Sequence, residues 1–146
     1  PLQAAMYTAA IANGGSLFRP YLVQQIIDTD GSIVKDTAPA PQQHIRAEEE
    51  ALAVIREGME RAVNGAHGTA HRAKTPVTHV AGKTGTAERG GKKGNNTWFI
   101  GFFPFEDPKY AVTVLIQDGE SGGRTAAPAA RRFIYAWLSS SKTAQR

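Results

Sequence analysis

The stretch from Val80 to Glu88, with the sequence VAGKTGTAE, constrains the fold and function of this chain more than any other. Its β-branched residues favour an extended strand, and its glycines leave the backbone open to close approach by another group. Side chains alternate along a strand, so Thr84 and Thr86 should point to one side and Lys83 and Gly85 to the other. The four groups can therefore converge only at the edge of a sheet.

An edge strand of this composition suits the binding of an extended peptide. The peptide would pair with the backbone as an added strand, Gly85 would avoid a side-chain clash, and the hydroxyls and the ammonium group would meet a carboxylate. The simpler interpretation is a bulged strand with a solvated lysine, which the tripeptide alone cannot distinguish from a binding site. The surrounding sequence has to be considered.

Two further strands are predicted after this motif. Residues 97–103 are almost wholly apolar in their second half, and valine, leucine and isoleucine dominate residues 110–117. A short segment with Pro108 joins them, so the three strands should form an antiparallel meander. Ahead of the motif, residues 66–78 have no strong periodicity and could hold one short helical turn.

Three helices are expected around this sheet. An alanine-rich helix should run from Leu2 to Ala12, ended by the glycines that follow Asn13. Apolar residues recur at spacings of three and four from Leu52 to Val63, with glutamates in the first turn, where negative charge suits the helix dipole. The last helix should span about 126–138, with a polar, frayed tail behind it. The apolar residues of the last two helices are Leu52, Ile55, Met59 and Val63, and Ala130, Phe133, Ile134, Trp137 and Leu138; Phe133 and Trp137 are assigned to the core.

The segment between the first two helices should contain a peripheral hairpin. Residues 21–27 and 32–34 are rich in β-formers and flank a turn with Gly31. Residues 38–43, with two prolines, are interpreted as a connecting loop. Together with the meander and the helices, this predicts an α+β chain in which helices flank an antiparallel sheet.

Composition narrows the class of protein. The chain has 146 residues, of which 41% are hydrophobic, which is enough for the modest core of a single domain. It has no cysteine, so disulfides and thiolate metal ligation are excluded, and no stretch approaches the roughly 20 apolar residues of a membrane span. The net charge is +4, and the basic residues gather near the motif, where they would attract anions: Arg72, Lys74, Lys83, Arg89, Lys92 and Lys93.

Other kinds of site fit less well. A phosphate-binding loop would need a glycine where Val77 stands. His67 and His71 have the spacing of zinc ligands, with His79 nearby, but the residues between the first two lack the glutamate of a zinc protease, and we expect no metal and no cofactor. The basic loop of residues 89–96 is interpreted as a solvated loop over a cleft rather than a nucleic-acid site, because no RNA-binding motif accompanies it.

Several motifs together resemble the C-terminal part of the transpeptidase domain of class B penicillin-binding proteins. They are GKTGTAE at 82–88, WFIGFFP at 98–104, DPKYAV at 107–112, and outlying matches at 1–3, 12–15, 19–21 and 68–70. The resemblance covers nearly the whole chain and is nearest the penicillin-binding protein 2 type used in cell elongation, with the septal relatives close behind. It implies that residues 1–146 are the C-terminal portion of one transpeptidase domain of the penicillin-binding-protein and serine β-lactamase fold.

The resemblance also implies an activity and a site. The family cross-links peptidoglycan stem peptides ending in D-alanyl-D-alanine through a serine acyl-enzyme, which β-lactams trap. By position in the motif, Lys83 would support proton transfer and hold the substrate carboxylate, Thr84 and Thr86 would supply hydroxyl ligands, and Gly85 would lie beside the substrate. The backbone N–H of Thr86 would be one donor of the oxyanion hole.

The catalytic serine is expected in an upstream segment that this chain lacks. In the family, the S-x-x-K and S-x-N motifs precede lysine-threonine-glycine. Ser32 to Lys35 fits S-x-x-K but lies in a predicted strand, Ser139 to Lys142 follows the motif that it should precede, and S-x-N is absent. The chain also begins inside a predicted helix without a capping residue, which is typical of a fragment or processed product.

Three alternatives and several partners follow from the resemblance. The chain could be part of a transpeptidase, part of a non-catalytic sensor of β-lactams or peptidoglycan, or part of a serine β-lactamase. The implied partners are the upstream segment, the stem peptides, β-lactams and a membrane glycosyltransferase that polymerises glycan; nucleic acid is not among them. The implied location is the periplasmic side of the inner membrane, with an anchor outside this chain.

Overall fold

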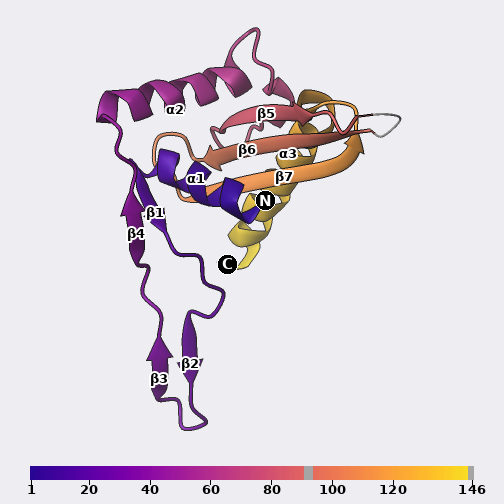
Figure 1. Ribbon diagram of the computed structural model, residues 1–146. Coiled ribbons are helices and arrows are strands. Elements are labelled where there is room, and N and C mark those ends of the chain that lie inside the picture. The colour runs from indigo at the N-terminus through magenta and orange to yellow at the C-terminus, as the bar shows by residue number, and fades with distance from the viewer. Residues whose placement is uncertain (91–93, 145–146) are drawn as a thin grey trace.

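The computed structural model describes residues 1–90 and 94–144, with side chains described as far as residue 140. Within these residues the chain forms three separate antiparallel sheets and three main helices (Figure 1). In order, the elements are α1 (Leu2–Ala12), β1 (Ser16–Phe18), β2 (Gln25–Ile27), β3 (Ile33–Asp36), β4 (Pro41–His44), α2 (Glu49–Asn64), a 3₁₀ turn η1 (His71–Ala73), β5 (Ala81–Ala87), β6 (Asn95–Phe103), β7 (Tyr110–Gly119), a π-helical turn η2 (Gly122–Ala126) and α3 (Ala127–Ala144). The predicted α+β class is confirmed.

The predicted meander is the central sheet, in the order β5-β6-β7. The β5–β6 pairing is continuous over seven residue pairs, with Lys83 opposite Ile100 and Gly85 opposite Trp98. Within this sheet β5 has a neighbour on one side only. The motif strand is therefore an edge strand, as its composition predicted.

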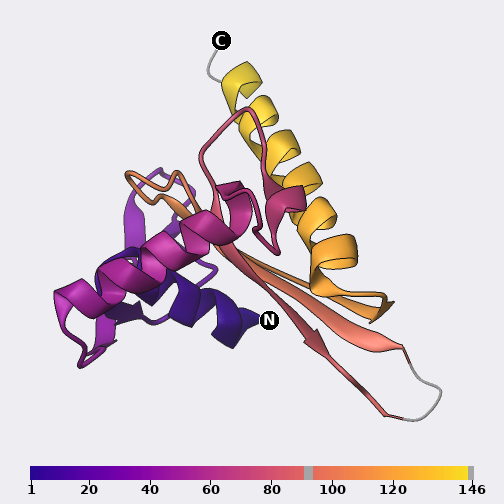
Figure 2. The ribbon, with the colours of Figure 1, turned by 90° about the horizontal axis from the view of Figure 1, so that it is seen from above.

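Helices cover both faces of the sheet. α1 packs on β6 and β7 from one side, while η2 and α3 pack from the other (Figure 1). α2 packs on β5 near its first residues, where the side-chain amide of Asn64 donates to the carbonyl of Val80 at 2.9 Å. Seen from above, the β5–β6 hairpin extends beyond the helices (Figure 2).

Two hydrophobic clusters hold these layers together. Alternation along β6 directs Phe99 and Phe103 to the α3 side and Phe102 to the α1 side. On the α3 side, small residues of the helix allow close approach to the sheet. The buried members there are Val63, Ala70, Ala73, Val80, Phe99, Phe103, Val112, Ala126, Ala127, Ala130 and Ile134; those on the α1 side are Ala12, Met59, Ala81 and Phe102.

β2 and β3 form an arm that projects away from the rest of the molecule (Figure 1). Every residue of both strands is exposed, so the prediction of a peripheral hairpin is confirmed. The predicted connecting loop is wrong: residues 41–44 form β4, which pairs with β1 beside the start of the arm. Because all four residues of β4 are exposed, their sequence carries no apolar alternation that could have revealed the strand.

All three predicted helices are present, but some predicted core residues and the bounds of the last helix are wrong. The first two helices and the short turn at η1 are confirmed, but Ile55 is 45% exposed. Phe133 and Trp137, predicted in the core, are 51% and 46% exposed; their rings stack on each other at 6.2 Å beside the stripe that contains Ala130 and Ile134. Helical structure also begins earlier, at η2, and continues through the predicted frayed tail to residue 144. Among the described residues, no helix has both the length and the apolar character needed to cross a membrane.

A charged cluster, which we call the His79 cluster, joins three elements next to the start of β5. Nδ1 of His79 lies 2.5 Å from a carboxylate oxygen of Glu106, in the β6–β7 turn. Nε2 of the same ring lies 2.9 Å from a carboxylate oxygen of Glu60, on α2. The hydrogen bond to Glu106 is the main cause that raises the pKa of His79 above 6.5; burial opposes it and Glu60 adds to it. Two ring nitrogens that both donate require the imidazolium form.

We expect the His79 cluster to stabilise the fold most between about pH 4.5 and pH 6.5. The contribution of His79 is complete below its unfolded pKa of 6.5 and is lost as the pH rises through its raised folded pKa. The same contact lowers the pKa of Glu106, so its contribution is present above 4.5 and is lost as the pH falls through the lowered value. Thermal unfolding of wild type and His79→Gln should differ most within this window.

The matched control is Glu57→Gln, which breaks the exposed pair of Glu57 with Arg61, whose closest nitrogen and oxygen atoms lie 3.6 Å apart. This variant should lie close to wild type at every pH, because exposed pairs contribute about 0–1 kcal/mol. A wild-type to His79→Gln difference that stays constant from pH 4 to pH 9 would contradict the role assigned to His79.

Candidate active-site strand

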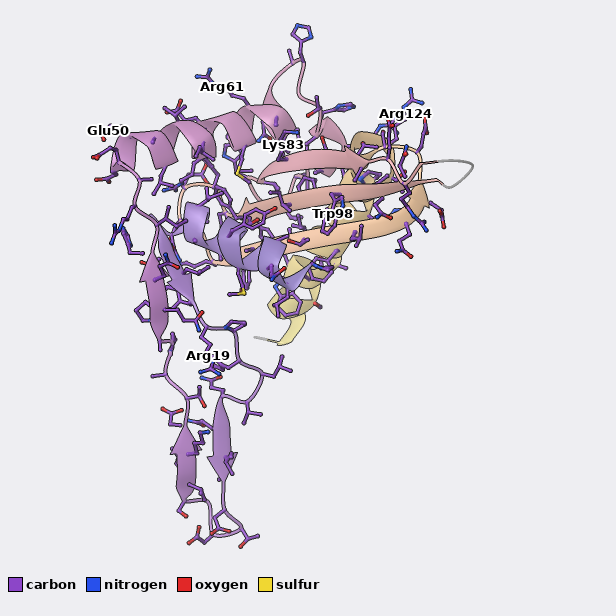
Figure 3. All side chains as sticks on the ribbon, in the orientation of Figure 1. Arg19, Glu50, Arg61, Lys83, Trp98 and Arg124 are labelled. Carbon is purple, nitrogen blue, oxygen red and sulfur yellow. The ribbon has the colours of Figure 1, made fainter. Side chains whose placement is uncertain are left out.

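The register of β5 on β6 places the motif side chains on two faces. Lys83 and Gly85 lie opposite Ile100 and Trp98, on the face that α1 covers, while Thr84 and Thr86 point to the face that carries η2. The predicted alternation is therefore present. Figure 3 shows Lys83 on β5 beneath α2, with Trp98 further along the neighbouring strand.

A small groove lies over this part of β5. It has a volume of about 250 Å³ and is lined by Tyr7, Lys83, Thr84, Gly85, Trp98 and Ile100. The ammonium nitrogen of Lys83 donates to the carbonyl oxygen of Thr84 at 2.5 Å, and the lysine is exposed. The cation thus lies along the strand next to Gly85, where an anionic group of a bound peptide could replace the carbonyl as its partner.

Both threonine hydroxyls of the motif are held from the opposite face. Thr84 Oγ1 donates to Thr69 Oγ1 at 3.3 Å, and Thr86 Oγ1 accepts the backbone N–H of Gly122 at 3.1 Å. Although Thr86 has this partner, its residue remains exposed. The sequence analysis predicts no role for Thr69 or Gly122. Thr69 lies within the match at 68–70, and Gly122 is followed by a second glycine in η2.

The two glycines of the motif differ in what surrounds them. A Cβ atom on Gly82 would lie 2.4 Å from the ring of Phe99 and 2.8 Å from the carbonyl oxygen of Ile100, so internal packing requires glycine there. A Cβ atom on Gly85 would meet only the Cβ of Trp98, at an ordinary 3.5 Å. No close contact in the described chain requires Gly85, which leaves its outer side free for another molecule.

We expect Gly82→Ala to destabilise the fold and Gly85→Ala to leave it almost unchanged. The overlap at Gly82 is typical of overpacking, which costs about 1–3 kcal/mol. The substitution at Gly85 creates no overlap, so its effect should stay within about 0.5 kcal/mol. Urea unfolding of the two variants measures both values, and equal losses at the two positions would show that internal packing also requires Gly85.

Not every basic residue near the strand is available to bind an anion. Arg89 pairs with Asp118 at 2.8 Å, while the predicted contribution of Lys92 and Lys93 to a loop over the site lies outside the described residues. Within residues 1–90 and 94–140, no group of three or more histidine and acidic side chains is arranged to hold a metal ion. The chemistry visible here is therefore that of an exposed ammonium group, two hydroxyls and an open strand edge.

Comparisons with known proteins place the chain in one family. A family model described as "Penicillin binding protein transpeptidase domain" matches residues 1–135, and the chain belongs to this family. Among curated proteins, it is 37% identical to the peptidoglycan D,D-transpeptidase PbpA of Mycolicibacterium smegmatis and 30% identical to MrdA of Haemophilus influenzae, in each case over 94% of the chain.

Solved structures agree with the sequence comparison. The penicillin-binding protein A of M. tuberculosis, solved as a ceftriaxone acyl-enzyme complex, superimposes with a TM-score of 0.82 at 35% identity over 93% of the chain. The chain spans only part of these proteins: 29% of the M. smegmatis PbpA, 23% of the H. influenzae MrdA and 32% of the M. tuberculosis structure. The predicted family and fold are thereby confirmed.

Proposed function

We propose that this chain supplies the substrate-binding strand of a serine D,D-transpeptidase that cross-links peptidoglycan stem peptides and is acylated by β-lactams. The observation that carries the proposal is the open environment of Gly85. Glycine at an edge position that internal packing does not require indicates that something outside this chain approaches the backbone there. Lys83 and the two threonines surround that position with donors.

Each of these donors suits a peptide that ends in a carboxylate. The Lys83 ammonium group and the Thr86 hydroxyl can donate to an anion, and the Thr84 hydroxyl can do so once Thr69 donates to it instead of accepting from it. Hydrogen bonds that involve a charged group are stronger than neutral ones. A peptide ending in D-alanyl-D-alanine offers a terminal carboxylate and an extended backbone that can pair with β5. Penicillins and cephalosporins carry a carboxylate next to the reactive amide and would use the same donors.

The proposed reaction has two balanced steps. A serine hydroxyl attacks the carbonyl carbon of the penultimate D-alanine; the peptide C–N bond breaks, and the terminal D-alanine leaves with the serine proton. The amine of a second stem peptide then attacks the ester, forming the cross-link and returning a proton to the serine. Lys83 would assist proton transfer, and the Thr86 N–H would stabilise the oxyanion, a contact that can lower the barrier by about 3 kcal/mol.

The serine itself would belong to a segment outside residues 1–146. Of the two S-x-x-K sequences in this chain, Ser32 and Lys35 lie on the exposed arm, and the other lies at the end of α3, which extends beyond the sheet (Figure 2). We therefore propose a partner segment with the S-x-x-K and S-x-N motifs. Membership of a cell-wall family supports a site on the periplasmic side of the inner membrane and a glycosyltransferase partner, in an elongation-type complex.

Labelling with a fluorescent penicillin tests this assignment. The chain alone should remain unlabelled, whereas the chain joined to a segment with S-x-x-K and S-x-N should acquire one label on the serine of that segment. Peptide mapping would refute the assignment if the label fell on any residue between Pro1 and Arg146. Incubation with a stem pentapeptide and an amine acceptor should then yield a new peptide bond; label without cross-linking indicates a sensor, and rapid release of the opened β-lactam indicates a β-lactamase.

We also expect Lys83→Gln in the joined protein to lower the rate of acylation by about 100-fold or more, the usual contribution of a group that transfers protons. The fold should not change, since Lys83 is exposed and, among the described residues, its ammonium group donates only to the adjacent carbonyl of Thr84. Stopped-flow acylation measures the rate, and circular dichroism checks the fold. Lys74→Gln, an exposed cation outside the strand, is the matched control and should acylate like wild type.

A further inference from the structure

The turn η2 packs directly behind the motif strand. β7 ends at Gly119, and after two residues the backbone N–H of buried Gly122 donates to Thr86 Oγ1 at 3.1 Å. The side chain of Trp98 lies on the opposite face of the sheet and Gly85 has none, so this residue pair presents only backbone to η2. The Gly122 backbone occupies that space.

The contact leaves no room for a side chain on Gly122. A Cβ atom there would lie 2.5 Å from the carbonyl oxygen of Gly85 and 2.7 Å from that of Trp98. Both atoms belong to paired strands and cannot move without disturbing the sheet. Glycine at position 122 therefore allows η2 to pack closer to β5 than any larger residue would.

The next residue makes a similar contact with the support of Thr84. A Cβ atom on Gly123 would lie 2.7 Å from the carbonyl oxygen of Thr69, the residue whose hydroxyl accepts from Thr84. The glycine pair thus adjoins the partners of both motif threonines. One surface of η2 keeps the Thr86 hydroxyl in place and also confines the residue that binds Thr84.

η2 is itself fixed by side-chain hydrogen bonds at its start. The hydroxyl of Ser121 accepts the N–H of Arg124 at 3.2 Å, and the hydroxyl of Thr125 accepts the N–H of Glu120 at 3.1 Å. Hydroxyls that accept from these backbone groups hold the first turn in one conformation. The N–H of Gly122 is consequently a fixed donor for Thr86.

The Gly122 N–H determines which further hydrogen bonds the Thr86 hydroxyl can make. A hydroxyl has one proton to donate and two lone pairs to accept. Because the Gly122 N–H has no lone pair, it can engage only an acceptor site of Thr86 Oγ1, so the hydroxyl proton must point to another partner. A carboxylate accepts only, and a hydroxyl that already accepts a hydrogen bond donates more strongly.

We propose that Gly122 is a positioning residue for carboxylate recognition: its N–H orients the Thr86 hydroxyl as a donor to the substrate carboxylate, and its missing side chain holds η2 against β5. The inference rests on the proposed function, in which Thr86 binds that carboxylate. It assigns part of the specificity to a residue that itself does not touch the substrate.

Gly122→Ala in the protein joined to the serine segment tests the proposal. Acylation rate constants are measured with a penicillin and with its methyl ester, which has the same reactive ring without the carboxylate charge. The variant should lose about tenfold to 100-fold of the wild-type preference for the acid, the usual size of a hydrogen bond to a charged group. Equal losses for acid and ester would overturn the proposal, because general damage does not depend on the carboxylate.

Gly58→Ala is the matched control. Gly58 is exposed on α2, and a Cβ atom there would have no neighbour within 4 Å, so both rate constants should equal those of wild type. If Gly122→Ala does not fold, Thr86→Ser and Thr86→Val replace it: the serine variant keeps the acceptor and should retain the preference for the acid, while the valine variant should lose it. A valine variant that keeps the preference would contradict the proposal.

Amide hydrogen exchange provides a readout that needs no acylation. The Gly122 amide should exchange faster in Thr86→Val than in wild type and remain protected in Thr86→Ser. Unchanged protection in the valine variant overturns the contact itself. Absence of acylation in the wild-type joined protein overturns the proposed function instead, so failure of the two proposals can be told apart.

Discussion

The pairing of β5 with β6 is the constraint on which the rest of the structure depends. Its register assigns Lys83 and Gly85 to one face and the two threonines to the other, and it leaves the outer edge of β5 without a strand in this sheet. The other elements act on this strand at different points. α2 and the His79 cluster secure its start, while η2 supports its second half from behind. A peptide would thus meet a strand that is already ordered, and less conformational entropy would be lost on binding.

The sequence alone predicted what local patterns encode. The three central strands, the existence of the three helices and the edge position of the motif follow from alternation, spacing and glycine placement. Family resemblance supplied roles for Lys83, Thr84, Gly85 and Thr86, which stay predictions until tested. Gly82 and Gly85 looked equivalent in the sequence. Only the packing around Phe99 separates the glycine that the fold needs from the one that it does not.

Features that depend on distant contacts could not be predicted. β4 has no buried residue, so its pairing with β1 leaves no hydrophobic pattern. Phe133 and Trp137 satisfy the apolar spacing of α3, but small alanines bring the helix so close to the sheet that the large rings lie at the side of the contact and stack on each other. Thr69 contacts Thr84, which is 15 positions away in the sequence, and Gly122 contacts Thr86, which is 36 positions away. Sequence periodicity carries no information about contacts over such separations.

The arm formed by β2 and β3 has a consequence for the energetics of the whole chain. A two-stranded ladder whose residues are all exposed gains little from burial and is marginally stable by itself. Its strands pair with each other and share no ladder with the central sheet, so they should open locally without unfolding β5, β6 and β7. The arm and the candidate site are therefore energetically almost independent, and substitutions can accumulate in one with little effect on the other.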